Sequence, residues 1–231
     1  ITIGSAIESN AAIYLGAKVR AYSGVIFNGS SNVGGALELA VTSEIETING
    51  SITINPGVDG VFAGSIVAMG DAGKIVVNGG ESFTLEGSLV AETNILITAG
   101  KVITADTSTL KALGSNATIR IAGTNGVEIN STVGDAASSP DLALLQIESS
   151  DGDVVIKKES GKIETTAELQ IAGQNVELYG WVVSTRNTAA TYDNEVTLRV
   201  DNTLTLAGTF TLAGSLLLAG KDVTLSNTSI N

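Results

Sequence analysis

The chain has 231 residues, of which 43% are hydrophobic but only 4% aromatic, and it contains 27 glycines and two prolines. Twelve basic residues against 24 acidic ones give a formal net charge of −12, which disfavours binding to nucleic acid or insertion into anionic membranes. The chain has neither cysteine nor histidine, which excludes disulfides, thiolate metal sites and Ser-His-Asp catalysis.

Residues 1–50 contain short alternating apolar pairs separated by turns rich in Gly, Asn and Ser. The pairs are Ile1/Ile3, Ile13/Leu15, Val25/Phe27 and Leu37/Leu39. A period of two over so few residues predicts half-buried strands rather than helices. Because the spacing is uneven, we expect about two coils here that are less regular than those that follow.

From residue 50 onward the alternating pairs recur at a nearly constant interval. The first strand of each unit is predicted at Ile52, Ile75, Ile95, Ile119, Leu145, Leu169, Val196 and Leu216, which gives intervals of 23, 20, 24, 26, 24, 27 and 20 residues. The stretch at 168–184 shows a whole unit, with runs at Leu169/Ile171, Val176/Leu178 and Trp181/Val183 separated by Gly-containing turns. Each unit is therefore expected to hold three short strands.

This period predicts an all-β fold, a parallel β-helix or solenoid of about nine or ten rungs, each of roughly 20–27 residues. Helical repeats do not fit, because no run places apolar residues at i, i+3, i+4 and i+7, and propeller blades are about twice as long. We expect residues 1–231 to form a single domain. Both ends look cut from a longer chain, and loops are expected to protrude near 134–141 and 186–194.

Three segments carry a resemblance to a known family. NILITAGKVIT (94–104), ELQIAGQNVELYG (168–180) and SLLLAGKDVTLSN (215–227) resemble the degenerate repeats of filamentous-haemagglutinin-like bacterial exoproteins, adhesins secreted by the two-partner route. The resemblance implies a right-handed β-helix and a non-catalytic, structural shaft segment that is extracellular or on the bacterial cell surface. It covers most of residues 50–231. The family's secretion motif is not reproduced: Asn55-Pro56-Gly57 lacks its second Asn and reads as a turn.

The partners expected of such a segment are the neighbouring rungs or domains of the same chain. End-to-end or lateral self-association and a host or surface glycan or protein are further possibilities. Tyr179, Trp181, Arg186 and Tyr192 form the densest aromatic and cationic group, a combination that can bind sugars. A binding module is therefore the alternative function, although the structural interpretation, in which Trp181 faces the interior or caps a loop, is favoured.

No catalytic, cofactor-binding or metal-binding residue is predicted. Asp151-Gly152-Asp153 has two potential calcium ligands, but it reads as a tight turn because no further oxygen donors follow at fixed spacing. A polysaccharide-degrading β-helix enzyme is the remaining alternative. It would require two carboxylates from neighbouring rungs to meet at the separation that glycoside hydrolysis needs.

Overall fold

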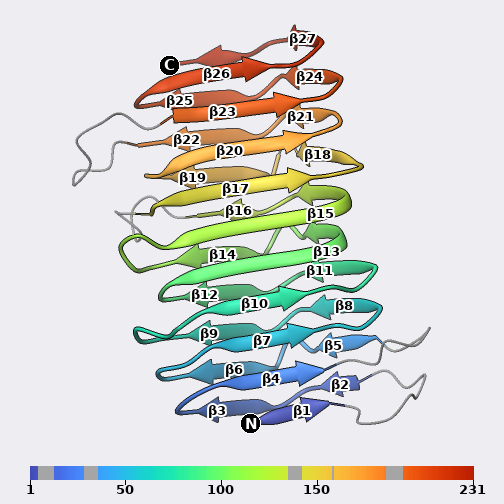
Figure 1. Cartoon of the computed structure of the whole chain (residues 1–231), viewed down its shortest axis with the longest axis vertical. Helices are drawn as coiled ribbons and strands as arrows, with labels where there is room; N and C mark the ends of the chain where they lie inside the picture. Colours follow the sequence, from blue (N-terminus) through green and yellow to red (C-terminus); the bar gives the residue numbers. More distant parts are fainter. Residues whose placement is uncertain (5–12, 29–35, 135–141, 158, 186–194) are drawn as a thin grey trace.

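The computed structural model describes the chain except for residues 5–12, 29–35, 135–141, 158 and 186–194. The described residues wind into one continuous coil that rises from the N-terminus at one end to the C-terminus at the other (Figure 1). Their regular structure is entirely β-strand. Within this part of the chain, no helix has the length and hydropathy to cross a membrane.

Each turn of the coil adds one strand to each of three faces. Face 1 contains β1 (Thr2–Gly4), β4 (Val25–Asn28), β7 (Ile52–Asn55), β10 (Ile75–Asn78), the first part of β13 (Asn94–Thr104) and of β15 (Thr118–Ile129), β17 (Leu144–Ser149), β20 (Glu168–Gly173), β23 (Glu195–Val200) and β26 (Ser215–Ala219). Face 2 contains β2 (Ile13–Leu15), β5 (Leu37–Leu39), β8 (Asp59–Phe62), β11 (Ser82–Leu85), the second part of β13 and β15, β18 (Asp153–Ile156), β21 (Val176–Leu178), β24 (Thr203–Leu206) and β27 (Asp222–Leu225). Face 3 is a sheet of ten strands, β3 (Lys18–Ala21), β6 (Glu44–Thr47), β9 (Ser65–Ala68), β12 (Ser88–Ala91), β14 (Thr109–Ala112), β16 (Thr132–Val133), β19 (Lys162–Thr165), β22 (Trp181–Ser184), β25 (Thr209–Leu212) and β28 (Ser229–Ile230).

Each strand pairs in parallel with its counterpart in the next coil. In Figure 1 the face 1 strands run from left to right in front, and the chain returns behind them from right to left as it rises. This sense of winding makes the coil right-handed. The predicted β-solenoid with three strands per rung is therefore confirmed, and the ten strands of face 3 correspond to ten coils among the described residues.

The predicted starting positions of the units are also confirmed. Ile52, Ile75, Ile95, Ile119, Leu145, Leu169, Val196 and Leu216 are successive partners in the face 1 ladder. From Ile52 to Leu169 these side chains are fully buried, and Val196 is 1% exposed. The interior is thus a stack of aliphatic columns, in which each side chain packs on the equivalent residue one coil away.

Two aromatic rings show how the columns accommodate larger side chains. Phe62 and Phe83 lie edge to face on neighbouring coils, with ring centroids 5.0 Å apart and an interplanar angle of 73°. Phe83 is paired with Gly60, and an added Cβ at Gly60 would lie 3.3 Å from the Phe83 ring. The missing side chain of Gly60 therefore provides the space that the Phe83 ring needs.

The expectation that Trp181 and Val183 form the inward pair of β22 is wrong. Trp181 is 55% exposed, whereas Val182 is 1% exposed and continues the inner column between Ile163 and Phe210. The strand alternates as expected, but with the opposite phase, and its other inward residue is Ser184.

The corner between faces 1 and 2 also differs from expectation in two coils. There, β13 and β15 run through the corner as strands of 11 and 12 residues, with a register shift between Ala99 and Lys101. Gly126 adopts φ +146°, a conformation that side chains disfavour, so it bends β15 without ending it. The turn expected at Asn55-Pro56-Gly57 contains Gly57 at φ +86°.

Within residues 1–50, the described parts form strands β1 to β6 in the first two coils. Of the two loops expected to protrude, residues 135–141 and 186–194 lie outside the described residues, so only Gly134 of the first loop is placed.

Candidate functional site

Outward-pointing residues of face 1 form columns just as the inward ones do. One column contains Arg120, Gln146, Gln170 and Thr197 in successive coils. The neighbouring column contains Ala122, Glu148, Ala172 and Arg199. Because alanines alternate with long charged side chains in the second column, the surface is hollowed between the charges.

Two adjoining hollows result, of about 350 and 410 Å³, and they share Glu148 and Ala172. The first is also lined by residues Thr98, Arg120, Ala122, Gly123, Thr124, Ser149 and Ser150. The second is also lined by residues Gln146, Glu168, Gln170, Ile171, Glu195, Thr197, Arg199 and Leu217. We call the two together the face 1 groove. Two arginines and three glutamates line it, which gives it donors and acceptors side by side.

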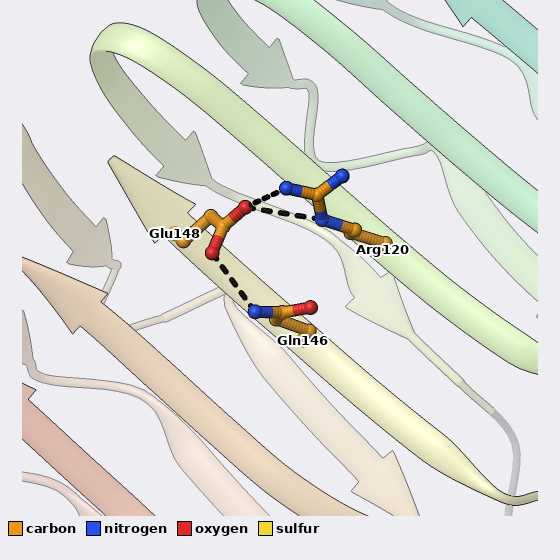
Figure 2. A network of polar contacts seen from close by, with 3 residues as sticks. All are labelled: Arg120, Gln146 and Glu148. Atoms are coloured by element: carbon orange, nitrogen blue, oxygen red, sulfur yellow. Dashed lines mark hydrogen bonds and ion pairs between the residues drawn. The ribbon is translucent and has the colours of Figure 1, made fainter. Parts of the chain in front are cut away.

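Glu148 is held firmly at the centre of the groove (Figure 2). Arg120 donates from Nε to Glu148 Oε1 at 3.0 Å, and Arg120 Nη2 contacts the same oxygen. Gln146 Nε2 donates to the other oxygen, Oε2, at 2.8 Å. Both carboxylate oxygens already accept hydrogen bonds, so Glu148 is anchored. Arg120 lies on the neighbouring coil, 28 residues away in sequence.

Two further carboxylates lie at equivalent positions on neighbouring strands, because each is one residue before the Leu169–Val196 pair. Gln170 Nε2 donates to Glu168 Oε1 at 2.6 Å, and Thr197 Oγ1 donates to Glu195 Oε1 at 2.8 Å. Both glutamates are exposed. In both glutamates, the hydrogen bond from a described side chain uses only Oε1.

Arg199 provides the complementary donors at the other side of the groove. Its side chain is exposed, and it makes no hydrogen bond or ion pair with another described residue. Among the described residues, the groove thus presents the Arg199 guanidinium at one end and the Glu168 and Glu195 carboxylates at the other, because Glu195 and Arg199 are four residues apart on β23, about 13 Å at roughly 3.3 Å per residue. This arrangement suits a polyhydroxylated ligand, whose hydroxyl groups both donate and accept.

The aromatic residues singled out from the sequence lie elsewhere. Trp181 projects from face 3, between Lys162 and Thr209 of the adjoining coils. Tyr179 lies at the corner before β22, where burial raises the pKa of its phenol and Glu177 raises it further through a hydrogen bond and its negative charge. Arg186 and Tyr192 lie outside the described residues. Of the four predicted ligand-binding residues, only Tyr179 and Trp181 are therefore placed.

Sequence reasoning missed the face 1 groove, although a signal for it exists. In β15, β17, β20 and β23, a polar or charged outward residue directly follows the residue that begins each unit, which is Ile119, Leu145, Leu169 or Val196. Aligning the units on those residues would have placed Arg120, Gln146 and Gln170 in one column. An interpretation based on aromatic residues does not single them out.

The Asp151-Gly152-Asp153 segment forms a turn that is hydrogen-bonded to Ser149 and to the next coil. Ser149 Oγ accepts from the Gly152 N–H at 3.1 Å, and Asp153 Oδ1 accepts from Asn175 Nδ2 of the next coil at 2.8 Å. Within the described residues, no three acidic side chains converge as a metal site.

Comparisons of the chain with protein-family models, with curated proteins and with solved structures found no match. The resemblance to filamentous-haemagglutinin-like exoproteins therefore remains a prediction from the repeat pattern.

Proposed function

We propose that this chain is a structural, non-catalytic shaft segment of a secreted bacterial surface adhesin or filament. The observation that carries the proposal is the continuity of the inner columns. The Ile52 column consists only of Ile, Leu and Val from β4 to β26. Such columns hold successive coils at a fixed spacing and thus build length with little sequence specificity.

The composition of the interior supports a mechanical role. Among the described residues, the buried polar side chains are Ser and Thr, and none is charged. Several of them bind the backbone or one another: Thr47 Oγ1 donates to the Gly50 carbonyl at 2.6 Å, and Ser131 Oγ donates to Thr104 Oγ1 at 2.8 Å. An interior of this kind stabilises the stack, as a structural role requires.

The cellular part of the proposal rests on the repeat resemblance and is tested on cells that produce the protein. An antibody against the folded solenoid should label intact cells as strongly as permeabilised cells, with a cytosolic marker labelled only after permeabilisation. Labelling that needs permeabilisation would refute the placement on the surface.

A second candidate function is glycan binding. The Arg199 guanidinium, which makes no ion pair with a described residue, and the Glu168 and Glu195 carboxylates in the same groove favour it. Hydrogen bonds between charged groups and hydroxyls are stronger than those between neutral groups. The protein should therefore retain hydroxyl-rich polysaccharides on a glycan array.

The array result is assigned to a site with three variants. Arg199→Ala should remove binding through the groove, and Trp181→Ala should remove binding through face 3. Arg20→Ala, which changes an exposed arginine that pairs with Glu46 on face 3, serves as the matched control. An array without any retained glycan would refute this second function.

A further inference from the structure

Face 1 presents a nearly balanced set of charges along the side of the solenoid. The described outward residues of its strands include two arginines and three glutamates, Arg120, Arg199, Glu148, Glu168 and Glu195. Face 2 differs, because its outward strand residues from β5 to β24 include five acidic residues and one lysine, namely Glu38, Asp59, Glu128, Asp153, Glu177 and Lys101. A second acidic chain therefore meets less repulsion at face 1 than at face 2.

Face 3 is also balanced, but its ion pairs are completed within the chain. Lys18 pairs with Glu44, Arg20 with Glu46, and Lys162 with Glu164. On face 1, Arg120 pairs with Glu148 in the same way, whereas Arg199 makes no ion pair with a described residue. Arg199 is therefore the face 1 cation that a second chain can engage.

The outward residues of face 1 form three columns, because its six-residue strands point every second side chain outward. The leading column contains Asn94, Thr118, Leu144, Glu168 and Glu195. The central column contains Ile26, Thr53, Val76, Leu96, Arg120, Gln146, Gln170 and Thr197. The trailing column contains Asn28, Asn55, Asn78, Thr98, Ala122, Glu148, Ala172 and Arg199.

We propose that face 1 binds face 1 of a second copy of this chain, with a two-fold axis that runs along the central column. The two coils then lie side by side and point in the same direction, and their face 1 strands are antiparallel across the interface. Each leading residue of one copy faces the trailing residue of the same coil in the other copy. The inference goes beyond the proposed shaft role and holds without it.

This arrangement provides Arg199 with a carboxylate partner. Glu195 of each copy lies opposite Arg199 of the other, so the symmetry forms the pair twice. One chain cannot form it alone, because the two residues are four apart on β23, about 13 Å at roughly 3.3 Å per residue. Packed sheets lie about 10 Å apart, a gap that the Glu195 and Arg199 side chains together span.

The shapes of the leading and trailing columns are also complementary. Glu168 of one copy lies opposite Ala172 of the other, so its side chain enters the hollow of about 410 Å³ that Ala172 helps to line. Thr118 lies opposite Ala122, which lines the second hollow. The face 1 groove of each copy is therefore filled by side chains of the other.

The central column meets its own copy across the axis. Val76 and Leu96 pack against their equivalents, and Ile26, which is 40% exposed in the single chain, is covered. Gln146 meets Gln146, and a side-chain amide can both donate to and accept from its copy. Arg120 meets Arg120, but each is paired with its own Glu148.

A two-fold dimer with the coils in opposite directions is less favourable. Full overlap of the two faces would then place Leu96 opposite Arg120 and Val76 opposite Gln146. The parallel arrangement also has sufficient area. Eight strands, β4, β7, β10, β13, β15, β17, β20 and β23, at about 4.8 Å each and about 20 Å wide give about 760 Å² per copy, close to the roughly 800 Å² that each partner buries in a standard interface.

The test uses charge reversals at the two ends of β23. Glu195→Arg places two arginines opposite each other, and Arg199→Glu places two glutamates opposite each other. Because each reversal creates a like-charge contact twice in the dimer, it should weaken dimerisation at least about 100-fold. Lys101→Glu reverses an exposed charge on face 2 and serves as the matched control. Far-UV circular dichroism and thermal melting establish that each variant is folded.

Sedimentation velocity over a concentration series then distinguishes the outcomes. The unchanged protein and Lys101→Glu should form dimers, and each β23 reversal alone should be a monomer. An equimolar mixture of Glu195→Arg and Arg199→Glu should form dimers again, because the arginines of one variant face the glutamates of the other. This rescue would not occur if either substitution merely damaged the fold.

Several results would overturn the proposal. A monomeric unchanged protein would do so, and it would leave the face 1 groove to a ligand such as a glycan. Dimers that survive both reversals, or a mixture that stays monomeric, would place the contact elsewhere. Small-angle X-ray scattering should show a dimer about as long as the monomeric variants but wider, and a dimer of twice the length would also contradict contact through face 1.

Discussion

The stacked inner columns predict that a side chain at position 60 would destabilise the protein. An added Cβ there would lie 3.1 Å from Pro56 Cβ and Cγ and 3.3 Å from the Phe83 ring, closer than ordinary contact. Gly60 does not have a positive φ, so the effect of a side chain is steric rather than conformational. Gly60→Val should therefore destabilise the protein by about 1–3 kcal/mol, the usual cost of overpacking.

The Phe83 ring should account for part of this cost, together with the slightly nearer Pro56 ring. Phe83→Ala alone should cost about 3–5 kcal/mol, because it removes a fully buried ring. In the double variant, the valine at position 60 can occupy part of the space left by the ring. The double variant should therefore be more stable than the sum of the two single costs predicts, by about 1–2 kcal/mol.

Urea unfolding followed by far-UV circular dichroism measures these differences, with free energies compared only where the denaturant slope is unchanged. Val61→Ala, one residue along and outward, is the control and should change stability by no more than about 0.5 kcal/mol. If the single costs of Gly60→Val and Phe83→Ala add within about 0.5 kcal/mol, the two residues do not share space, and the packing argument is wrong.

Three further predictions concern polar groups. Asn55 accepts a hydrogen bond from Asn78 at 3.3 Å and donates one to Asn28 at 2.7 Å. Asn55→Ala should therefore lower the free energy of unfolding by about 1–2 kcal/mol in urea unfolding, more than Asn78→Ala does. A larger loss for Asn78→Ala would contradict this row of asparagine hydrogen bonds. Arg120→Ala should cost at most about 1 kcal/mol, and less in high salt, because the Arg120–Glu148 pair is partly exposed; a larger, salt-independent loss would show a different role. Burial, and after it Glu177, raise the pKa of the Tyr179 phenol above its ordinary value of 10.0. The protonated phenol therefore stabilises the folded state below pH 10.0, and this contribution is lost as pH rises through the raised pKa. Tyrosinate absorbance is titrated in the protein and in Tyr179→Phe, and the difference between the two curves should have a midpoint above pH 10.0. Glu177→Gln should lower that midpoint only in part. A midpoint at the ordinary value would refute the assignment.

The fold was predictable because the residues of its inner columns begin alternating apolar runs that recur along the sequence. Ile75, Ile95 and Ile119 each begin an alternating run, and a ladder that is parallel and in register places such residues on top of one another. The phase of β22 was harder to predict, because both Trp181/Val183 and Val182/Ser184 alternate. Weight given to the larger apolar side chain favoured the wrong pair.

The corners and the groove depend on information that a single unit lacks. Gly126 resembles a turn residue in sequence, yet it bends a continuous strand. Arg120 and Glu148 resemble ordinary solvated residues, and only the coil spacing brings them into contact. Predicting the groove therefore requires the register of successive coils, and the uneven intervals of 20–27 residues obscure that register in the sequence.

The most direct test of the whole account is to duplicate one coil. Residues 95–118 form a complete unit, since Ile95 pairs with Ile119, and each of these residues is described. A tandem copy inserted after residue 118 should fold and lengthen the particle by one coil spacing, about 4.8 Å. Small-angle X-ray scattering should show this increase in maximum dimension without a change in cross-section. An unfolded product, or a wider particle of unchanged length, would contradict the claim that interchangeable coils build the solenoid.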